Sequence, residues 1–299
     1  MNEWVPLVRA GRSYANLAAN KPLPPGTDSI NLPKVNSGTA VAIQTADNAA
    51  ISEVDLTDTS VSAAVKTIAG MQGISLQALE QSPLSFDDII LADLAMDYAP
   101  KLDQQVISGS GSGNQVTGVR NTSGIITITA TDATTELSKS QTVYKKIGDA
   151  IQRIHTQRYA SPEVIVMHPR RWQAFCTLFA SDGRLAIVPD GAAFNQFGVL
   201  ERVAPENFVG KLQGLPVVVD ANMPTTLGAG TNEDVIHVLR ASDLYLYESS
   251  LRTQVFQETR ATSLTVLFRL HGYLAFLAGR YPKSVVEIGG TALTAPTFA

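Results

Sequence analysis

The feature that most constrains the fold is the stretch from Ser82 to Gly118, which has the pattern of one long helix followed by a glycine-rich loop. Apolar residues recur every four positions from Phe86 to Val106, which places them on one face of a helix. Ser85 is positioned to cap the first turn, and Pro100 predicts a kink or a brief break because it lacks a backbone donor. A Gly-Ser-Gly-Ser-Gly run that begins at Gly109 ends the helix, since glycine enters left-handed conformations without strain.

Composition restricts the class of protein. The chain has 299 residues, 44% of them hydrophobic, which is enough for one large domain or two ordinary ones. A net charge of −4 argues against a surface built mainly to bind nucleic-acid phosphates. Cys176 is the only cysteine, so no intrachain disulfide and no cysteine zinc site can form. No signal segment or bilayer-length apolar run is present, and we therefore expect a soluble protein made in a reducing compartment.

The segment 30–66 is too open for a compact domain. Between residues 35 and 65 the chain has no lysine or arginine, and its charged residues are all acidic: Asp47, Glu53, Asp55 and Asp58. Weak alternation at both ends predicts a long two-stranded extension with an acidic tip, which needs another surface, such as a second copy, because an isolated hairpin is marginal in water. An ordinary exposed loop is the alternative. Residues 1–29 form either an arm lying on something else or a frayed terminus.

A second unit follows, in which helices alternate with short apolar strands. A helix is predicted over 141–159, with Val143, Ile147, Ile151 and Ile154 on its apolar face. Its other faces carry Lys145, Lys146, Arg153 and Arg158, which are either solvated or receive the acidic hairpin of a neighbour. Strands are predicted at 163–169, 217–219, 234–239 and 244–247, and a helix starts at Pro169 and ends at Gly183. This alternation is typical of a mixed sheet covered by helices.

The last fifty residues are rich in threonine, valine, phenylalanine and leucine. We expect long antiparallel strands over 253–269 and 273–277, with the turn at His271-Gly272, and a final strand over 284–288. Paired strands need cover for their apolar face, and the helix that starts near Ser85 is the candidate partner.

No catalytic chemistry is recognisable in the sequence. The glycine run from Gly109 follows a helix, whereas a phosphate-binding loop follows a strand and opens a helix, so a helix-terminating turn is the better interpretation. The four histidines are scattered, and Cys176 lies in an apolar helical stripe typical of a buried thiol. We therefore assign no catalytic, cofactor-binding or metal-binding residue and expect a protein that is not an enzyme.

Five short motifs occur in a fixed order along the chain. They are the acidic extension 30–66, the helix end GSGSGNQVTG (109–118), VMHPRRW (166–172), LQGLPVV (212–218) and RYPKSVVE (280–287). In this order they resemble the major capsid proteins of tailed bacteriophages, the Hong Kong 97 fold family, over most of the chain.

The resemblance implies an α+β subunit with four parts. These are an N-terminal arm (1–29), an extended E-loop hairpin (30–66), a peripheral (P) domain of a long spine helix and long antiparallel strands (67–159 and 251–280), and an axial (A) domain with a mixed sheet flanked by helices (160–250 and 281–299). Some family members form lysine–asparagine crosslinks from an E-loop lysine. No lysine lies between Lys34 and Lys66, so we expect no such crosslink here.

The resemblance also implies a function. Copies would assemble as hexamers and pentamers into the icosahedral shell of a virion, in the cytoplasm of the host bacterium. The shell would enclose double-stranded DNA and contact it non-specifically, and no membrane would be a partner. Scaffolding, portal and decoration proteins are the implied partners, with scaffolding either a separate protein or a segment already removed. Contact between copies is expected to pair Glu53, Asp55 and Asp58 with Lys145, Lys146, Arg153 and Arg158. The alternatives are an encapsulin-like compartment that encloses protein cargo and a soluble two-domain α/β enzyme.

Overall fold

The computed structural model describes residues 6–47, 50–51, 53–82, 85–132, 134–177 and 208–298. The α-helices of these residues are α1 (Ser13–Leu17), α2 (Leu76–Gln81), α3 (Phe86–Ser108), α4 (Glu136–Gln157) and α5 (Pro169–Thr177). The strands are β1 (Ala19–Pro22), β2 (Ser29–Ser37), β3 (Thr57–Ala64), β4 (Lys66–Ser75), β5 (Ile126–Thr129), β6 (Val164–Met167), β7 (Phe208–Leu212), β8 (Leu215–Val219), β9 (Ile236–Leu239), β10 (Tyr245–Glu248), β11 (Arg252–Arg260), β12 (Thr265–Leu277) and β13 (Val285–Gly289). Short 3-10 turns are η1 (Val119–Asn121), η2 (Ala241–Asp243), η3 (Ala261–Ser263), η4 (Pro282–Ser284) and η5 (Thr291–Leu293).

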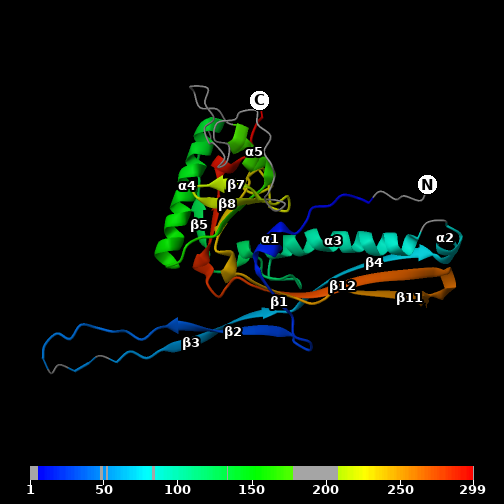
Figure 1. The fold of residues 1–299 in the computed structure, drawn as a ribbon, viewed down its shortest axis with the longest axis horizontal. Helices are drawn as coiled ribbons and strands as arrows, with labels where there is room; N and C mark the ends of the chain where they lie inside the picture. Colours follow the sequence, from blue (N-terminus) through cyan, green and yellow to red (C-terminus); the bar gives the residue numbers. More distant parts are fainter. Residues whose placement is uncertain are drawn as a thin grey trace.

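A five-stranded sheet lies along helix α3 (Figure 1). Strand β12 is its centre: β4 pairs with one edge, and β10 and β11 share the other. Parallel pairing of β1 with β10 completes the sheet. Helix α3 covers one face, where Leu94 lies over Gly70 of β4 and Tyr98 lies over Gly272 of β12. This confirms the expectation that the long helix covers the paired strands.

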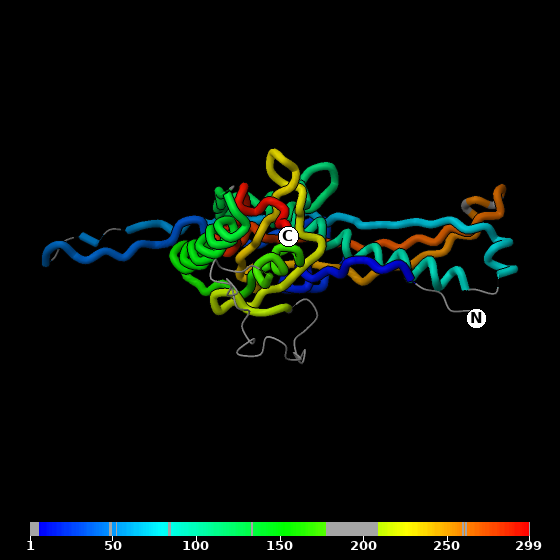
Figure 2. Tube along the Cα trace, turned by 90° about the horizontal axis from the view of Figure 1, so that it is seen from above, coloured from blue at the N-terminus to red at the C-terminus, as the bar shows by residue number. Residues whose placement is uncertain are grey.

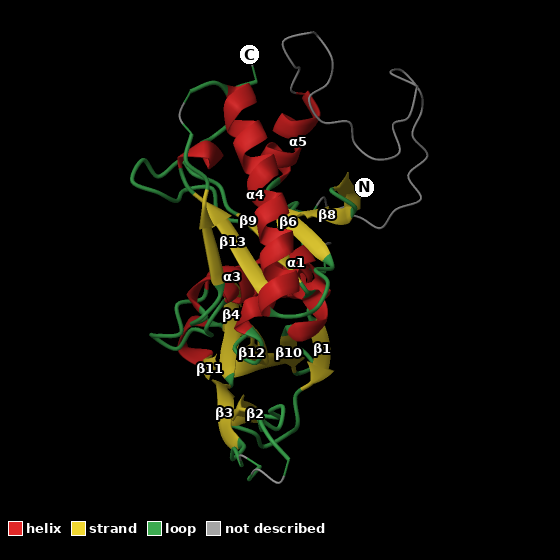
Figure 3. Cartoon of the chain, turned by 90° about the vertical axis from the view of Figure 1, so that its left-hand side faces the viewer, coloured by secondary structure: helices red, strands yellow, loops and turns green. Residues whose placement is uncertain are grey.

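The second sheet is mixed and has six strands in the order β5-β13-β9-β6-β8-β7. Both of its faces are buried, and alternate residues serve different cores. Val285 packs in the core that contains α1 and the C-terminal half of α3, whereas Val286 packs in the core under α4 and α5. Helix α4 crosses in front of this sheet (Figure 3).

The third structure is the hairpin of β2 and β3, which pairs with neither sheet. It extends to one side of the six-stranded sheet, and helix α3 with β4, β11 and β12 extends to the other (Figure 2). The predicted two-stranded extension is therefore present, and the molecule is elongated.

Helix α3 differs from expectation at both ends and in the middle. It runs without a break through the buried Pro100, so the predicted brief break is absent. The Ser85 side chain makes no capping hydrogen bond. Gly109 ends the helix with φ −52°, outside the left-handed region, but a Cβ there would lie 2.3 Å from the carbonyl oxygen of Val116. Close approach of two backbones explains this glycine.

The turn between the last two long strands was predicted at the wrong place. Residues 261–264 connect β11 to β12, and His271 and Gly272 lie inside β12. The dipeptide has turn chemistry, but Gly272 is required because the Tyr98 hydroxyl would lie 2.6 Å from a Cβ at that position. Glycine in a strand often marks such close packing.

Sheet membership crosses the predicted domain bounds at two places. Strand β5 pairs within the six-stranded sheet, and helix α4 packs on that sheet. The predicted peripheral domain, 67–159, placed both elements with helix α3. Strand β10 belongs to the five-stranded sheet, although 160–250 placed it in the other domain. Helix α5 is described to Thr177, and its predicted end at Gly183 lies outside the described residues.

Candidate subunit-contact surfaces

The base of the hairpin is anchored on its own chain. Ile30 of β2 joins a small apolar cluster with Tyr247 of β10 and with Ala275 and Leu277 of β12. Val61 of β3 packs against the same cluster. The hairpin is therefore not free along its whole length, and the segment that lacks support begins beyond residue 35.

No described residue covers the apolar side chains at the far end of the hairpin. Strand pairing ends at Ser37 opposite Thr57, and the described residues between them form no strand. Val41, Ile43 and Ile51 are 99%, 95% and 89% exposed. Exposed apolar side chains gathered in one segment are typical of an interaction surface.

The acidic residues of the hairpin lie on this same end. Glu53 and Asp55 are exposed in the loop, and Asp58 is exposed on β3 opposite Val35. None of the three forms an ion pair with a described residue. The end of the hairpin thus combines negative charge with apolar surface, which suits a complementary surface that carries cations.

The four cations expected to receive the hairpin do not form one free surface. On α4, Lys145 is exposed and Lys146 half-buried, and neither has an ion-pair partner among the described residues. Arg153 pairs with Asp149 at 3.0 Å along the same helix.

Arg158, just beyond α4, is occupied within the chain. Its Nε lies 2.8 Å from Asp243 Oδ2 and its Nη2 lies 3.2 Å from Oδ1, and its guanidinium stacks 3.8 Å from the ring centre of Tyr281. The hydrogen bond to Asp243 raises the pKa of Arg158 above its ordinary value. A bidentate, stacked arginine fastens segments within the subunit, so Arg158 is less available than a free cation for the predicted contact between copies.

A second cationic surface, not singled out from the sequence, lies on the five-stranded sheet. Register places Arg252 opposite His271, Arg269 opposite Gln254 and Arg260 opposite Thr265. Leu270 faces α3, so the odd-numbered residues of β12 and their partners point to the opposite face, which no described helix covers (Figure 1). The signal available in the sequence was the presence of arginines among the apolar and threonine residues of this region, but only the register shows that they share a face.

The arginines of this open face differ from those of the body. Arg252, Arg260 and Arg269 form no ion pair with a described residue, although Arg269 lies over the Phe256 ring at 4.7 Å. Elsewhere arginines meet carboxylates, as in the pairs Arg9–Asp93, Arg12–Glu248, Arg120–Glu287 and Arg171–Asp234. The open face therefore carries positive charge that the described chain leaves unneutralised.

Buried charges elsewhere are structural. Arg171 and Asp234 are almost fully buried and 2.8 Å apart, and Arg171 Nη2 also donates to the carbonyl of Leu293 at 2.7 Å, which holds the C-terminal segment. Burial raises the pKa of the Cys176 thiol to about 11, so this cysteine is a poor nucleophile. No group of three described His, Cys, Asp or Glu side chains could hold a metal ion.

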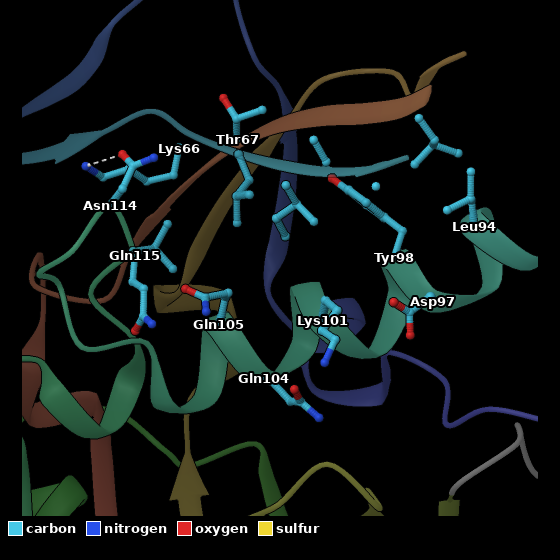
Figure 4. A pocket seen from close by; sticks show the side chains of 16 residues that line it. Lys66, Thr67, Leu94, Asp97, Tyr98, Lys101, Gln104, Gln105, Asn114 and Gln115 are labelled. Atoms are coloured by element: carbon cyan, nitrogen blue, oxygen red, sulfur yellow. Dashed lines mark hydrogen bonds between the residues drawn. The ribbon is translucent and has the colours of Figure 1, made fainter. Parts of the chain in front are cut away.

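One groove lies between the C-terminal half of α3, strand β4 and the glycine-rich loop (Figure 4). Its volume is about 380 Å³, and Lys66, Tyr98, Lys101 and Gln105 are among its lining residues. Lys66 Nζ donates to Asn114 Oδ1 at 3.3 Å, and burial raises the pKa of Tyr98 to about 12. This set contains no pairing of a nucleophile with a base, so the groove has no catalytic arrangement.

No described helix is long and apolar enough to cross a lipid bilayer. Among the described residues, the hairpin end and the two cationic faces are the candidate surfaces for contact between copies.

Comparison with known proteins agrees with this arrangement. The sequence profile of the phage capsid family matches residues 4–278. No curated protein sequence matches.

Solved capsid structures share the fold. The capsid of a native GTA particle, computed with C5 symmetry, superposes with a TM-score of 0.72 at 14% identity, covering 97% of this chain and 94% of that one. The capsid of Myoviridae phage XM1 superposes with a TM-score of 0.70 at 12% identity, covering 97% of this chain and 96% of that one. A structure from Gordonia phage Cozz superposes with a TM-score of 0.69 at 14% identity, covering 97% of this chain and 90% of that one.

These matches confirm the α+β capsid fold and favour a shell-forming role over the alternatives of a cargo compartment or a soluble enzyme. The family match covers nearly the whole chain, including helix α3, the hairpin, the five-stranded sheet and every strand of the six-stranded sheet except β13. The chain therefore belongs to the phage capsid family: it is a major capsid protein, a structural subunit whose copies together form the shell of a virion.

Proposed function

We propose that copies of this chain assemble as pentamers and hexamers into an icosahedral shell around phage double-stranded DNA, and that the hairpin of each copy lies over a neighbouring copy. The observation that carries the proposal is the uncovered hairpin end, where Val41 and Ile43 are almost fully exposed next to acidic side chains. A surface of this kind gains stability only against a partner. Many modest contacts of this type are collectively strong in a closed shell.

The surface that receives the hairpin is proposed from charge complementarity. Lys145 and Lys146 of α4 remain candidates, whereas Arg153 and Arg158 have partners within the chain. The open face of the five-stranded sheet offers three arginines without carboxylate partners and adds apolar surface, since Met71 of β4 is 56% exposed. Acidic and apolar groups of the hairpin end match this face better than they match α4.

The other parts of the proposal follow from composition and sheet membership. A subunit of net charge −4 attracts DNA phosphates only weakly, so it can enclose DNA while contacting it non-specifically. Scaffolding, portal and decoration proteins would be partners, and assembly would take place in the host bacterial cytoplasm. The domain division is retained with residues 126–157 moved to the A domain and β10 moved to the P domain, because each then joins the sheet with which it pairs.

The test reverses the charge of the hairpin. We expect the double variant Asp55→Lys/Asp58→Lys to reduce the yield of shells at least about tenfold, measured by sedimentation and negative-stain microscopy, because like charges would face each other at every copy of the contact. The matched control is Asp87→Lys/Asp88→Lys, which makes the same charge change at exposed residues outside the hairpin.

Compensating variants then identify the receiving surface. Assembly restored by adding Arg252→Glu/Arg269→Glu supports the sheet face, and assembly restored by adding Lys145→Glu/Lys146→Glu supports α4. A hairpin variant that assembles as well as the wild type at both low and high salt would contradict the proposed contact.

A further inference from the structure

Two carboxylic acids meet in the interior where three parts of the chain join. Asp103 lies on α3 and is fully buried, and Asp220 follows β8 and is 2% exposed. The two side chains bind the same residue: Asp220 Oδ1 accepts the backbone N–H of Asn222 at 2.8 Å, and Asp103 Oδ2 accepts its side-chain amide at 2.9 Å. Two buried carboxylates held this close repel each other when both are ionised, and a proton shared by the two removes that repulsion.

The pair holds the N-terminal segment. Asp220 Oδ2 accepts the backbone N–H of Tyr14 at 2.9 Å, and Asp103 Oδ1 accepts the backbone N–H of Ala15 at 2.7 Å. The Asn222 side-chain amide donates to Asp103 Oδ2 at 2.9 Å and to the carbonyl of Gly11 at 2.7 Å. Helix α1 is thereby fastened to α3 and to the six-stranded sheet through the same two side chains.

The charged groups nearest the pair do not neutralise a second negative charge. On α1, burial raises the pKa of the Tyr14 phenol well above 10, and its hydroxyl lies 2.9 Å from His237 Nδ1. On the far side of that ring, His237 Nε2 lies 3.3 Å from Glu287, which Arg120 also binds. The side chains of Tyr14, His237, Glu287 and Arg120 therefore bind one another and not the Asp103–Asp220 pair.

The remaining neighbours are also occupied or uncharged. Burial lowers the pKa of His168, which lies after β6 near Asp220. In the arm, Arg9 is bound by Asp93 and Arg12 by Glu248. No cation of the described residues forms an ion pair with Asp103 or Asp220.

We propose that the Asp103–Asp220 pair is a proton-dependent latch, which fastens α1 across the junction of the two sheets and releases it when the shared proton is lost in mildly alkaline solution. Loss of the proton places two negative charges side by side in a buried space. Burial, followed by the Asp220 side chain, raises the pKa of Asp103 to about 8, which places this release within an accessible pH range.

The direction of the pH effect follows from the sign of this shift. The pKa of Asp103 is higher in the folded chain than the ordinary value of 3.8, so the folded chain binds the additional proton. The latch contributes fully at low pH and weakens as the pH rises, with local release of α1 once the pH passes about 8.

Hydrogen exchange of the full-length protein tests the latch. Protection of the amides of residues 11–18, corrected for the intrinsic exchange rate at each pH, is expected to fall at least tenfold between pH 7 and pH 9. Protection of β6, inside the six-stranded sheet, should not change. In Asp103→Asn the amide cannot ionise, so protection of residues 11–18 should stay within about twofold over the same range.

Two further variants complete the test. Asp220→Asn should give the same flat profile as Asp103→Asn, and it replaces that variant if Asp103→Asn fails to fold. Glu248→Gln removes the ion pair of Arg12 outside the latch, and it should keep the pH-dependent step. A wild-type profile without a step, or an unchanged step in both asparagine variants, would overturn the proposal.

Discussion

Individual side chains in this protein are organised by whether their charge is neutralised inside the chain. Arg171 and Arg158 are both bound by carboxylates, Arg171 also donates to the backbone carbonyl of Leu293, and each fastens segments that are far apart in the sequence. Arg252 and Arg269 on the open sheet face have no such partner among the described residues. Residue type does not distinguish these two groups, because the difference depends on which carboxylate the fold brings close.

Glu287 shows the consequence of neutralisation for stability. Burial by itself would raise the pKa of Glu287, but hydrogen bonding to His237 and the charge of Arg120 outweigh burial and lower it to about 2. The folded pKa is below the ordinary 4.5, so this contribution to stability is present above about pH 4.5 and is lost as the pH falls toward 2. The size of the contribution is on the order of 3 kcal/mol.

The variant Glu287→Gln tests this linkage. We expect it to be less stable than the wild type at pH 6 and to lose less stability than the wild type between pH 4.5 and pH 2, measured by urea unfolding of unassembled subunits. Parallel acid profiles of the two proteins would show that Glu287 does not contribute in this way. The variant Arg153→Gln, which breaks an exposed pair, serves as the control and should change stability by less than about 1 kcal/mol.

At the scale of the element, the local sequence pattern of helix α3 predicts that it forms, and tertiary packing determines which part is buried and keeps it continuous. Its apolar spacing predicts the helix, and its C-terminal half, with Leu102 and Val106 fully buried, joins the core shared by the two sheets. Toward its N-terminal end, Leu94 is only partly buried over β4. Pro100 does not interrupt this helix, since packing along both halves offsets the loss of one hydrogen bond.

The end of α3 gives a sharp prediction. A Cβ at position 109 would lie 2.3 Å from the carbonyl oxygen of Val116 and 2.5 Å from that of Gln105, and neither backbone group can move cheaply. We therefore expect Gly109→Ala to destabilise the subunit by about 2 kcal/mol or more in urea unfolding.

Gly38→Ala is the matched control for that substitution, because nothing lies within 4 Å of a Cβ there and the backbone is not left-handed. Its unfolding midpoint should equal that of the wild type. Equal midpoints for both alanine variants would show that the loop after α3 adjusts without cost.

At the scale of the whole molecule, the hairpin distinguishes a solitary subunit from a subunit in a shell. Its base packs on Tyr247 and Leu277, whereas residues 38–47 are exposed. In unassembled protein we expect the amides of 38–47 to exchange within about tenfold of the rate of an unfolded peptide, and in assembled shells we expect at least tenfold slower exchange.

Strand β6 provides the internal reference for this comparison, since all of its residues are buried in the single subunit. It should be protected equally in both states. Equal, strong protection of 38–47 in solitary subunits would show that the hairpin needs no neighbour.

The sequence by itself determined the elements and the family. Periodicity predicted α3, α4 and most strands, because helix and strand spacing is a local property, and the run without cations between 35 and 65 predicted the projecting hairpin. Tertiary structure alone decided that β5 pairs with β13, that Arg158 is bound by Asp243, and that Asp103 meets Asp220. These partners are distant along the chain, and no local spacing specifies which distant side chains the packing of two sheets around one helix brings into contact.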